Sequence, residues 1–360
     1  MENKNLNNIK TEIIQEESST ARIRLKKEIN RAIKRATRRK SDKVKIIIIL
    51  VFAGLYAIFS LIITLNEKIW KNESIPEWHE LYEMAGFSSS AYKGKHGDLA
   101  VHFIDVGQGD CALVVYKDYT ILIDSGEFSE RSKVITYIRS LNIKHINMII
   151  ASHPHSDHIG SISSVIDEYG TDLLIMPDVA DNMTPVSSSF VNMIDSAEKC
   201  GAEIKYADIG GSYAIDERCT IDFIAPVSDY EDYNNYSIVC RLNYDENSFI
   251  FTGDIEELAE RDIVDNDCDI AADVIKVAHH GSETSSLKVF IQSVNPDYAV
   301  ISVGKRNDYG HPHKETLALL ELLGVELYRT DYHGDIVMFS DGNRITVVTE
   351  EKEIPFNVYS

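Results

Sequence analysis

The distribution of apolar and polar positions changes at residue 98. From there on, short apolar runs such as CALVVY, INMII and SFIF are bounded by turns rich in Gly, Asp and Asn. Such runs are typical of buried strands. Helical spacing occurs between several of them, near 130–141, 187–200, 255–264, 284–293 and 314–323. This mixture of β-hairpins and βα units predicts one α/β domain with two mixed sheets and helices on both outer faces.

One segment before that domain is apolar throughout. Residues 46–65, IIIILVFAGLYAIFSLIITL, contain no charge, and twenty helical residues span roughly 30 Å, the thickness of the hydrocarbon core of a bilayer. A buried core helix is rarely apolar on every face over such a length. A cleaved signal peptide has a shorter apolar stretch that ends in small residues, whereas NEKIWKNES follows here. The segment therefore predicts a single transmembrane helix.

Charge predicts the orientation of that helix. Residues 1–65 carry 14 Lys/Arg against 6 Asp/Glu, a net charge of +8, whereas the rest of the chain has a net charge of −29. Because the basic run 22–45 directly precedes the apolar segment, the positive-inside rule places the N-terminus in the cytoplasm and residues 66–360 outside. Apolar residues at helical spacing within 22–45 also suit a helix lying on anionic lipid, although a solvated stop signal for insertion explains them equally well.

These features divide the chain into four parts. Residues 1–45 form a basic cytoplasmic tail, 46–65 a membrane anchor, 66–97 a juxtamembrane linker and 98–350 the α/β domain. The five cysteines form no CxxC pair, and their pairing cannot be assigned. None lies near a histidine cluster, which disfavours thiolate ligands.

The candidate chemistry begins where one predicted strand ends. INMII is followed by ASHPHSDHIGS, which places His153, His155, Asp157 and His158 within six residues. Zinc takes imidazole and carboxylate ligands, and manganese also accepts them. The spacing lets His153 and His155 face one metal ion while Asp157 and His158 face a second. A surface loop that is rich in histidine by chance is the alternative.

Two later motifs offer more ligands. Asp254 follows the apolar run FIFTG, where its carboxylate could bridge two cations about 3.5–4 Å apart. Capping of the following helix is a serious alternative for this aspartate. His279 and His280 follow the run VIKVA. If the chain is extended there, the two adjacent side chains point to opposite sides and have different partners.

Taken in order, these motifs resemble a known family. HFIDVGQGDCALV, ILIDSG, HPHSDH, NNYSIVCRL, FTGDI, KVAHHGSETSS and YGHPH are together similar to the hydrolase domain of the ComEC/Rec2 competence family, within the metallo-β-lactamase fold hydrolases. The resemblance covers residues 98 to about 345. It implies an αββα sandwich with a two-metal groove at one edge. The full competence proteins also carry a multi-helix channel, which these 360 residues lack, so the chain is not expected to form an import pore by itself.

The resemblance also assigns roles to residues. It implies one or two divalent metal ions, with zinc preferred to manganese, and chemistry at Asp157 and His279, where His279 contacts the substrate phosphate. The metal ligands implied are His153, His155, Asp157, His158, Asp254 and His280. A hydrogen bond from Asp124 would orient a ligand histidine. The other residues expected near the metals or the substrate are Asp105, Gln108, Asp110, Asn234, Asn235, Ser237, His311 and His313, although a plain loop explains the last two almost as well.

One position departs from the wider fold. Many members supply a third histidine to the first metal, but no histidine occurs between His158 and His279 here, and NNYS (234–237) stands in its place. Amides and hydroxyls bind zinc poorly, so this departure argues against β-lactamase activity and leaves the number of metals open.

The expected function is a metal-dependent phosphodiesterase outside the membrane. The resemblance favours DNA as the substrate. The net charge of −29 favours a smaller phosphodiester, such as one of cell-wall teichoic acid or phosphocholine, because polyanion binding normally uses a basic surface. A membrane-anchored binding protein with a degenerate site is the alternative of a different class.

Overall fold

The computed structural model describes residues 98–350, together with residues 27, 54, 58–62 and 359. The chain divides into two compact units, Met1–Trp78 and His79–Ser360. Apart from the few residues named, the predicted basic tail, membrane anchor and linker lie outside the described residues. No helix formed by the described residues is long and apolar enough to cross a membrane. The membrane anchor therefore stays a prediction.

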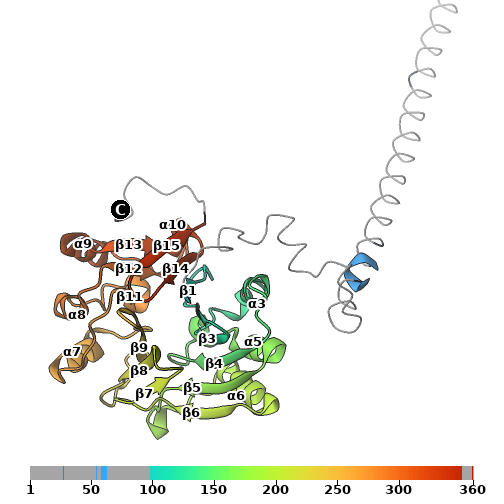
Figure 1. The fold of residues 1–360 in the computed structure, drawn as a ribbon, viewed down its shortest axis with the longest axis horizontal. Coiled ribbons are helices and arrows are strands. Elements are labelled where there is room, and N and C mark those ends of the chain that lie inside the picture. The colour runs from blue at the N-terminus through green and yellow to red at the C-terminus, as the bar shows by residue number, and fades with distance from the viewer. Residues whose placement is uncertain (1–26, 28–53, 55–57, 63–97, 351–358, 360) are drawn as a thin grey trace, which may run out of the picture. The chain divides into compact units, whose positions relative to one another are not determined.

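The first sheet of the described domain has eight strands, and its outer helices lie on one side of it (Figure 1). It is mixed, since β1 to β3 and β14 to β15 pair antiparallel while β3 to β6 run parallel. In spatial order its strands are β15 (Ile345–Thr349), β14 (Ile336–Ser340), β1 (Leu99–Phe103), β2 (Ala112–Tyr116), β3 (Tyr119–Ile123), β4 (Ile146–Ile150), β5 (Thr171–Met176) and β6 (Glu203–Tyr206).

The second sheet has seven strands among the described residues and is also mixed. Its parallel part runs from β10 to β13, and its antiparallel part from β7 to β10. In spatial order its strands are β13 (Glu326–Arg329), β12 (Tyr298–Ile301), β11 (Val274–Lys276), β10 (Asn247–Phe251), β9 (Val239–Tyr244), β8 (Cys219–Ala225) and β7 (Ser212–Ala214).

Helices cover the outer face of each sheet (Figure 1). The first sheet is covered by α3 (Arg131–Ser140), α5 (Ile162–Tyr169) and α6 (Ser188–Cys200), and the second by α7 (Glu257–Asp265), α8 (Lys288–Val294) and α9 (Lys314–Leu323). The short helices are η3 (Phe128–Glu130), α4 (Ser156–Ile159), η4 (Asp181–Met183), η5 (Ala278–Gly281) and α10 (Thr330–His333). The predicted αββα sandwich of two mixed sheets is confirmed.

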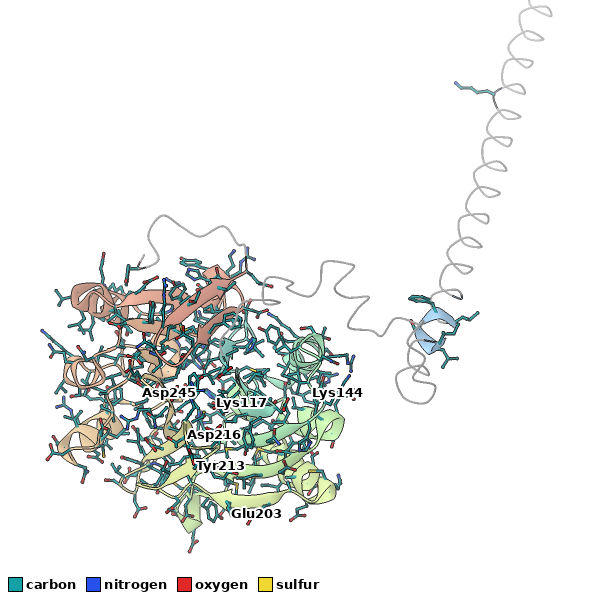
Figure 2. All side chains as sticks on the ribbon, viewed as in Figure 1. Lys117, Lys144, Glu203, Tyr213, Asp216 and Asp245 are labelled. Atoms are coloured by element: carbon teal, nitrogen blue, oxygen red, sulfur yellow. The ribbon has the colours of Figure 1, made fainter. Side chains whose placement is uncertain are left out.

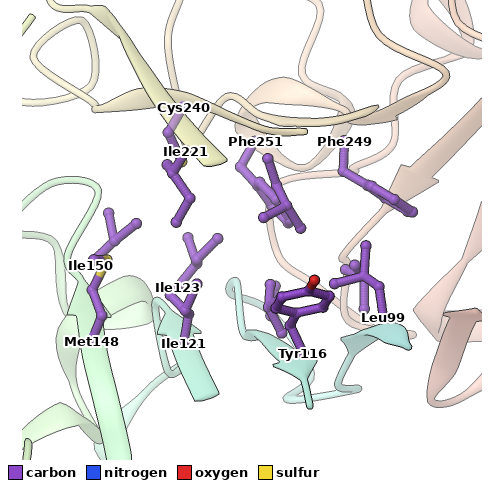
Figure 3. Close-up of a cluster of buried hydrophobic side chains, with 14 of the residues drawn as sticks. Leu99, Tyr116, Ile121, Ile123, Met148, Ile150, Ile221, Cys240, Phe249 and Phe251 are labelled. Atoms are coloured by element: carbon purple, nitrogen blue, oxygen red, sulfur yellow. The ribbon is translucent and has the colours of Figure 1, made fainter. Parts of the chain in front are cut away.

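The main core lies between the two sheets (Figure 3). Ile121 and Ile123 of β3 point into this layer, opposite Ile221 and Phe251 of the second sheet. Leu122, between them in sequence, packs on the opposite face with the helices. Successive side chains of a strand alternate between faces, so a strand buried on both faces needs an uninterrupted apolar run. Because of this requirement, the strands buried on both faces can be recognised in the sequence as apolar runs.

The two ends of the sandwich differ in chemistry. At the end where β3 begins, Lys117 pairs with Asp216 at 2.7 Å, and Arg218 pairs with Asp245 (Figure 2). These pairs are exposed and contribute little stability. At the other end, the carboxyl ends of the parallel pair β3 and β4 and of the parallel strands β10, β11 and β12 open into polar loops. The candidate site residues follow those strand ends.

Candidate metal centre

Four residues form the centre of the site. Asp157 and His158 lie on α4, which follows β4, whereas Asp254 follows β10 and His280 follows β11. Each offers one ligand atom, and these atoms all lie within 4.8 Å of one another. His158 Nε2 is 3.2 Å from Asp254 Oδ2, and His280 Nε2 is 3.5 Å from the Oδ2 atoms of Asp157 and Asp254. Two imidazoles and two carboxylates from both sheets thus converge on one point.

The donor atoms at this point suit a cation. His158 Nε2, His280 Nε2 and Asp254 Oδ1 are buried and have no hydrogen-bond partner. Buried polar atoms are rarely left unpaired, because the unmade hydrogen bond costs about 1–3 kcal/mol. A divalent metal ion would satisfy all three atoms, and zinc or manganese takes such a mixed set. The residues therefore fit the metal that the sequence predicted.

His153 and His155 form a second pair beside the cluster. The His153 ring lies 4.2 Å from the His158 ring, and its Nε2 is 3.0 Å from Nδ1 of His155. Nδ1 of His153 contacts the hydroxyl of Ser237 at 3.2 Å. Burial lowers the pKa of His153 well below its usual value, so its ring is neutral, as a metal ligand must be. The predicted division into two pairs is compatible with this arrangement.

The inner histidines are held from behind by carboxylates. Asp124 Oδ2 lies 2.8 Å from Nδ1 of His158 and also accepts the hydroxyl of Ser152 at 2.6 Å. Asp110 Oδ1 lies 3.2 Å from Nδ1 of His280, and the Ser302 carbonyl lies 3.0 Å from the same nitrogen. Partners of this kind fix the ring orientation and leave Nε2 to face the cluster.

Nearby carboxylates also govern the protonation of the two inner histidines. Burial opposes a charge on His158 and His280, yet the nearby carboxylates outweigh it and raise the pKa of both imidazoles well above the usual value. Asp254 contributes most to this rise at both rings, followed by Asp124 at His158 and Asp110 at His280. Protons and a metal ion therefore compete for the same nitrogens.

The chain turns sharply at His279 and His280, and the expectation of an extended strand end is wrong here. Both residues adopt left-handed backbone angles, with φ of 49° and 53°. Such angles cost energy in residues other than glycine and cluster at functional sites. The two side chains nevertheless have different partners. His279 lies at the groove surface, with Nδ1 3.2 Å from Oε1 of Glu256 and Nε2 4.0 Å from Oδ2 of Asp254.

The segment in place of a third histidine has three separate roles. Asn234 lines the groove. The amide oxygen of Asn235 accepts the backbone N–H groups of Glu256 and Ala259 at 3.1 and 3.2 Å, so this residue holds the start of α7. Ser237 accepts the backbone N–H of Asp254 at 3.1 Å and contacts His153. Asp254 is not the N-cap of α7, a position that Glu256 occupies. The capping alternative for Asp254 is therefore wrong.

A groove of about 320 Å³ opens above the cluster. Burial and the neighbouring histidines lower the pKa of His311, in its wall, to about 4. Two predicted site residues, Asp105 and His313, are not among those that line the groove. Asp105 pairs with Lys133 at 3.4 Å, and Nδ1 of His313 accepts the Glu283 N–H at 2.9 Å. The lining residues are Gln108, His155, Ser156, Asp157, Asn234, Asp254, His279, His280, Tyr309 and His311.

Sequence reasoning assigned no role to four residues of the site: Lys276, which pairs with Asp110, Glu256, which contacts His279, and Ser156 and Tyr309 in the groove wall. Lys276 lies within the run VIKVA, and a lysine within a buried strand is itself a signal. Tyr309 begins the motif YGHPH, which the sequence connects with the site only through its histidines, and Glu256 lies in a loop with no distinguishing local pattern.

The comparison with known families agrees with this site. The sequence profile of the Metallo-beta-lactamase superfamily matches residues 104–305, which is more than half of the chain. The chain belongs to the metallo-beta-lactamase superfamily. The match begins at the end of β1 and contains all four cluster residues, and members of this superfamily are generally metal-dependent hydrolases.

Curated relatives narrow the assignment. The chain is 30% identical to ComE operon protein 3 of Bacillus subtilis over 260 residues, or 66% of this chain and 32% of that protein. It is 26% identical to the competence protein ComA of Neisseria gonorrhoeae over 257 residues, or 70% of this chain and 34% of that protein. The matches thus span about a third of the length of these relatives. They make the chain a ComEC/Rec2-type member of the superfamily, as its motifs predicted.

Solved structures with the same fold are more distant. The metallo-beta-lactamase fold protein YhfI from Bacillus subtilis is 11% identical, with a TM-score of 0.44, and the match covers 69% of this chain and 100% of that one. The metallo hydrolase Igni18 from Ignicoccus hospitalis is 15% identical, with a TM-score of 0.43, over 69% of this chain and 98% of that one. Likeness at this level adds nothing about substrate.

Proposed function

We propose that this chain is a metal-dependent phosphodiesterase that acts outside the membrane. The observation that carries the proposal is the convergence of three buried, unpartnered donor atoms, His158 Nε2, His280 Nε2 and Asp254 Oδ1, beneath an open groove. Donors left unpaired in this way suit a bound cation. The open groove gives a substrate access to the same point.

Asp157, His158, Asp254 and His280 would hold one divalent ion, with zinc preferred and manganese as the alternative. His153 and His155, together with Asp254, would hold a second ion if one binds. Bound metal supplies a water of lowered pKa and neutralises the charge on phosphoryl oxygens. Asp157 belongs both to this ligand set and to the groove wall.

The proton chemistry is assigned to His279. Its ring borders the groove but lies outside the four-residue cluster, so it can face a phosphodiester rather than the metal. Glu256, 3.2 Å from Nδ1, holds the ring with Nε2 turned toward Asp254. From there, Nε2–H can donate a hydrogen bond or a proton to a phosphoryl oxygen. Such donors are effective because they are in place before the reaction begins.

DNA is the proposed substrate, on the strength of the relation to competence proteins. The net charge of −29 beyond residue 65 favours a smaller diester of teichoic acid or phosphocholine, which is kept as the second candidate. A β-lactam substrate is not proposed, because Ser237 and the asparagines stand where three-histidine enzymes carry their third ligand. The four converging ligand atoms also argue against a degenerate site.

The test uses the full-length protein purified in mild detergent. We expect bound zinc or manganese by elemental analysis, and metal-dependent cleavage of an oligonucleotide. Asp254→Ala should abolish both metal binding and cleavage. Asp245→Ala, a carboxylate at the opposite end of the sandwich, serves as the matched control and should change neither. Cleavage of teichoic acid without cleavage of DNA would replace the substrate, and metal binding without any hydrolysis would refute the activity.

A further inference from the structure

The loop that follows β12 forms one wall of the groove. Within it, Tyr309 and His311 line the same cavity as Asp157, Asp254 and His280. The Tyr309 ring stacks on His311, with 5.6 Å between centroids and 23° between planes. Tyr309 is nevertheless 67% exposed. One face of the tyrosine is thus supported by the groove wall while the ring stays open to solvent.

The loop is held in place by its own hydrogen bonds. The Asn307 side chain donates to the carbonyls of Gly304 and His311 at 2.9 and 2.7 Å, and accepts the N–H groups of Tyr309 and His311 at 3.2 and 2.9 Å. The Gly304 N–H donates to Oε1 of Gln108 at 3.2 Å. A Cβ on Gly304 would lie 2.8 Å from the backbone nitrogen of Gln108, so only glycine allows this approach. The Tyr309 ring is therefore positioned before any ligand binds.

The same loop carries positive charge in an acidic protein. Lys305 and Arg306 are exposed, and neither makes an ion pair with any residue in the described part of the chain. In contrast, Lys117, Lys276 and Arg241 each have a carboxylate within 3.2 Å. The net charge of −29 beyond residue 65 therefore does not describe this loop, in which the two basic side chains outnumber the one carboxylate, Asp308. Both basic side chains remain available to a polyanion.

We infer that residues 304–309 bind single-stranded nucleic acid beside the cluster: a base stacks on Tyr309 while Lys305 and Arg306 contact the neighbouring phosphates. This inference rests on the proposed phosphodiesterase function and specifies its substrate. Proteins that bind single strands combine aromatic stacking platforms with basic grooves, and every base offers a ring face. Bases in a duplex are already stacked, and teichoic acid has no aromatic rings, so neither offers the tyrosine a free aromatic face.

The experiment compares two strands of equal length and charge. A fluorescent oligothymidylate and the same backbone without bases are titrated with the full-length protein in EDTA, so that no strand is cut. We expect the strand with bases to bind about tenfold more tightly, from the stacking of one base. Tyr309→Ala should remove that difference and Tyr309→Phe should keep it. Tyr206→Ala, at a tyrosine 56% exposed on β6, is the control and should also keep it.

The role of the two basic side chains is tested by the salt dependence of binding. Lys305→Gln with Arg306→Gln should weaken both strands and reduce the slope of log affinity against log salt by about 1.4, which corresponds to two phosphate contacts at roughly 0.7 each. An unchanged slope shows that the two side chains do not contact phosphates and overturns that part of the inference. Equal binding of the two strands by the unmodified protein overturns the base-stacking part.

Hydrolysis with metal restored separates this inference from the proposed function. If both strands are cut equally well, the phosphodiesterase stands and the tyrosine has no role in choosing the substrate. If the strand with bases binds more tightly yet no diester is cut, the binding loop stands and the proposed activity fails.

Discussion

The ammonium nitrogen of Lys276 lies 2.7 Å from Oδ2 of Asp110, and both side chains are almost completely buried. The other carboxylate oxygen of Asp110 lies 3.2 Å from Nδ1 of His280. Burial disfavours the charged form of Asp110, but Lys276 and His280 outweigh it, so the pKa of this carboxyl lies below its usual value. An ion pair thus supports the candidate metal ligand from inside the sandwich.

Lys276→Met should destabilise the domain strongly, because it leaves the Asp110 charge buried without its counter-ion. The loss of unfolding free energy should be about 3–5 kcal/mol, measured by urea unfolding followed by circular dichroism. Lys305→Met, at an exposed and unpaired lysine, is the control and should cost less than about 0.5 kcal/mol. Adding Asp110→Asn to Lys276→Met should recover part of the loss. Strictly additive effects would show that the two charges do not interact.

The ligand set predicts which variants lose metal. Asp157→Ala and His280→Ala should each lower the bound metal measured by elemental analysis, since each removes one of four converging donors. Asn235→Ala should keep the metal but lower the unfolding free energy by about 1–3 kcal/mol, because two buried N–H groups of α7 lose their acceptor. Full occupancy in both ligand variants would mean that the metal binds elsewhere.

His279→Ala separates chemistry from metal binding. The variant should keep its metal and slow turnover by about 10²–10³-fold, the range expected for one positioned donor. His145→Ala, which removes a surface histidine paired with Asp172 at 3.0 Å, is the control and should leave the rate unchanged. Loss of metal in His279→Ala with retention in His280→Ala would exchange the two roles.

Membrane topology is predicted by the uncharged segment 46–65 and the basic run before it. Protease added to intact cells without their wall should digest the domain at 98–350, because the positive-inside rule places it outside. A tag after Ser360 reports the cleavage, and a cytoplasmic protein serves as the control for intact membranes. Protection of the tag would place the domain in the cytoplasm.

The sequence predicts the features that are set by neighbouring residues better than those set by contacts between distant segments. INMII was recognised as a strand and is β4, because burial on both faces leaves only apolar residues at Ile146–Ile150. Strand β7 (Ser212–Ala214) was missed, because only Tyr213 of its three residues is partly buried. For Asp254 the sequence predicts a metal ligand and leaves helix capping open, and only the fold, which places it 3.2 Å from His158, decides between them.

The remaining misses concern contacts between segments far apart in sequence. The counter-ion of Lys276 lies in the loop between β1 and β2 of the other sheet, so only the fold explains why a lysine ends a buried strand. The left-handed angles of His279 and His280 arise in the turn after β11, where three successive residues have positive φ and only the third, Gly281, is a glycine. Tyr309 is a single aromatic residue in a loop. Its position depends on Asn307 and Gln108, which hold that loop through contacts that the sequence does not show.

A buried carboxyl away from the metal centre gives a prediction about pH. Glu260 of α7 accepts the backbone N–H groups of Ser286 and Leu287, both at 2.6 Å, just before α8. Burial outweighs these two bonds and raises the pKa of Glu260 from 4.5 to about 7. Between these values, the folded chain holds a proton that the unfolded chain has released. The unfolding free energy should therefore fall as pH rises from about 4.5 to 7, by roughly 3 kcal/mol in total.

Glu260→Gln tests the sign of this effect, since glutamine is uncharged at every pH. At pH 5 the variant should be less stable than the unmodified protein by about 1 kcal/mol, because one of the two N–H groups loses its acceptor. As pH rises to about 7, the unfolded chain releases the Glu260 proton and the unfolding free energy of the unmodified protein alone falls, so the difference should shrink or reverse and then stay constant. Urea unfolding at pH 5, 6, 7 and 8 measures it, with Glu257→Gln on the exposed face of the same helix as the control. If the Glu260→Gln curve ran parallel to that of the unmodified protein over the whole range, Glu260 would titrate alike in the folded and unfolded chains, and burial would not control its proton.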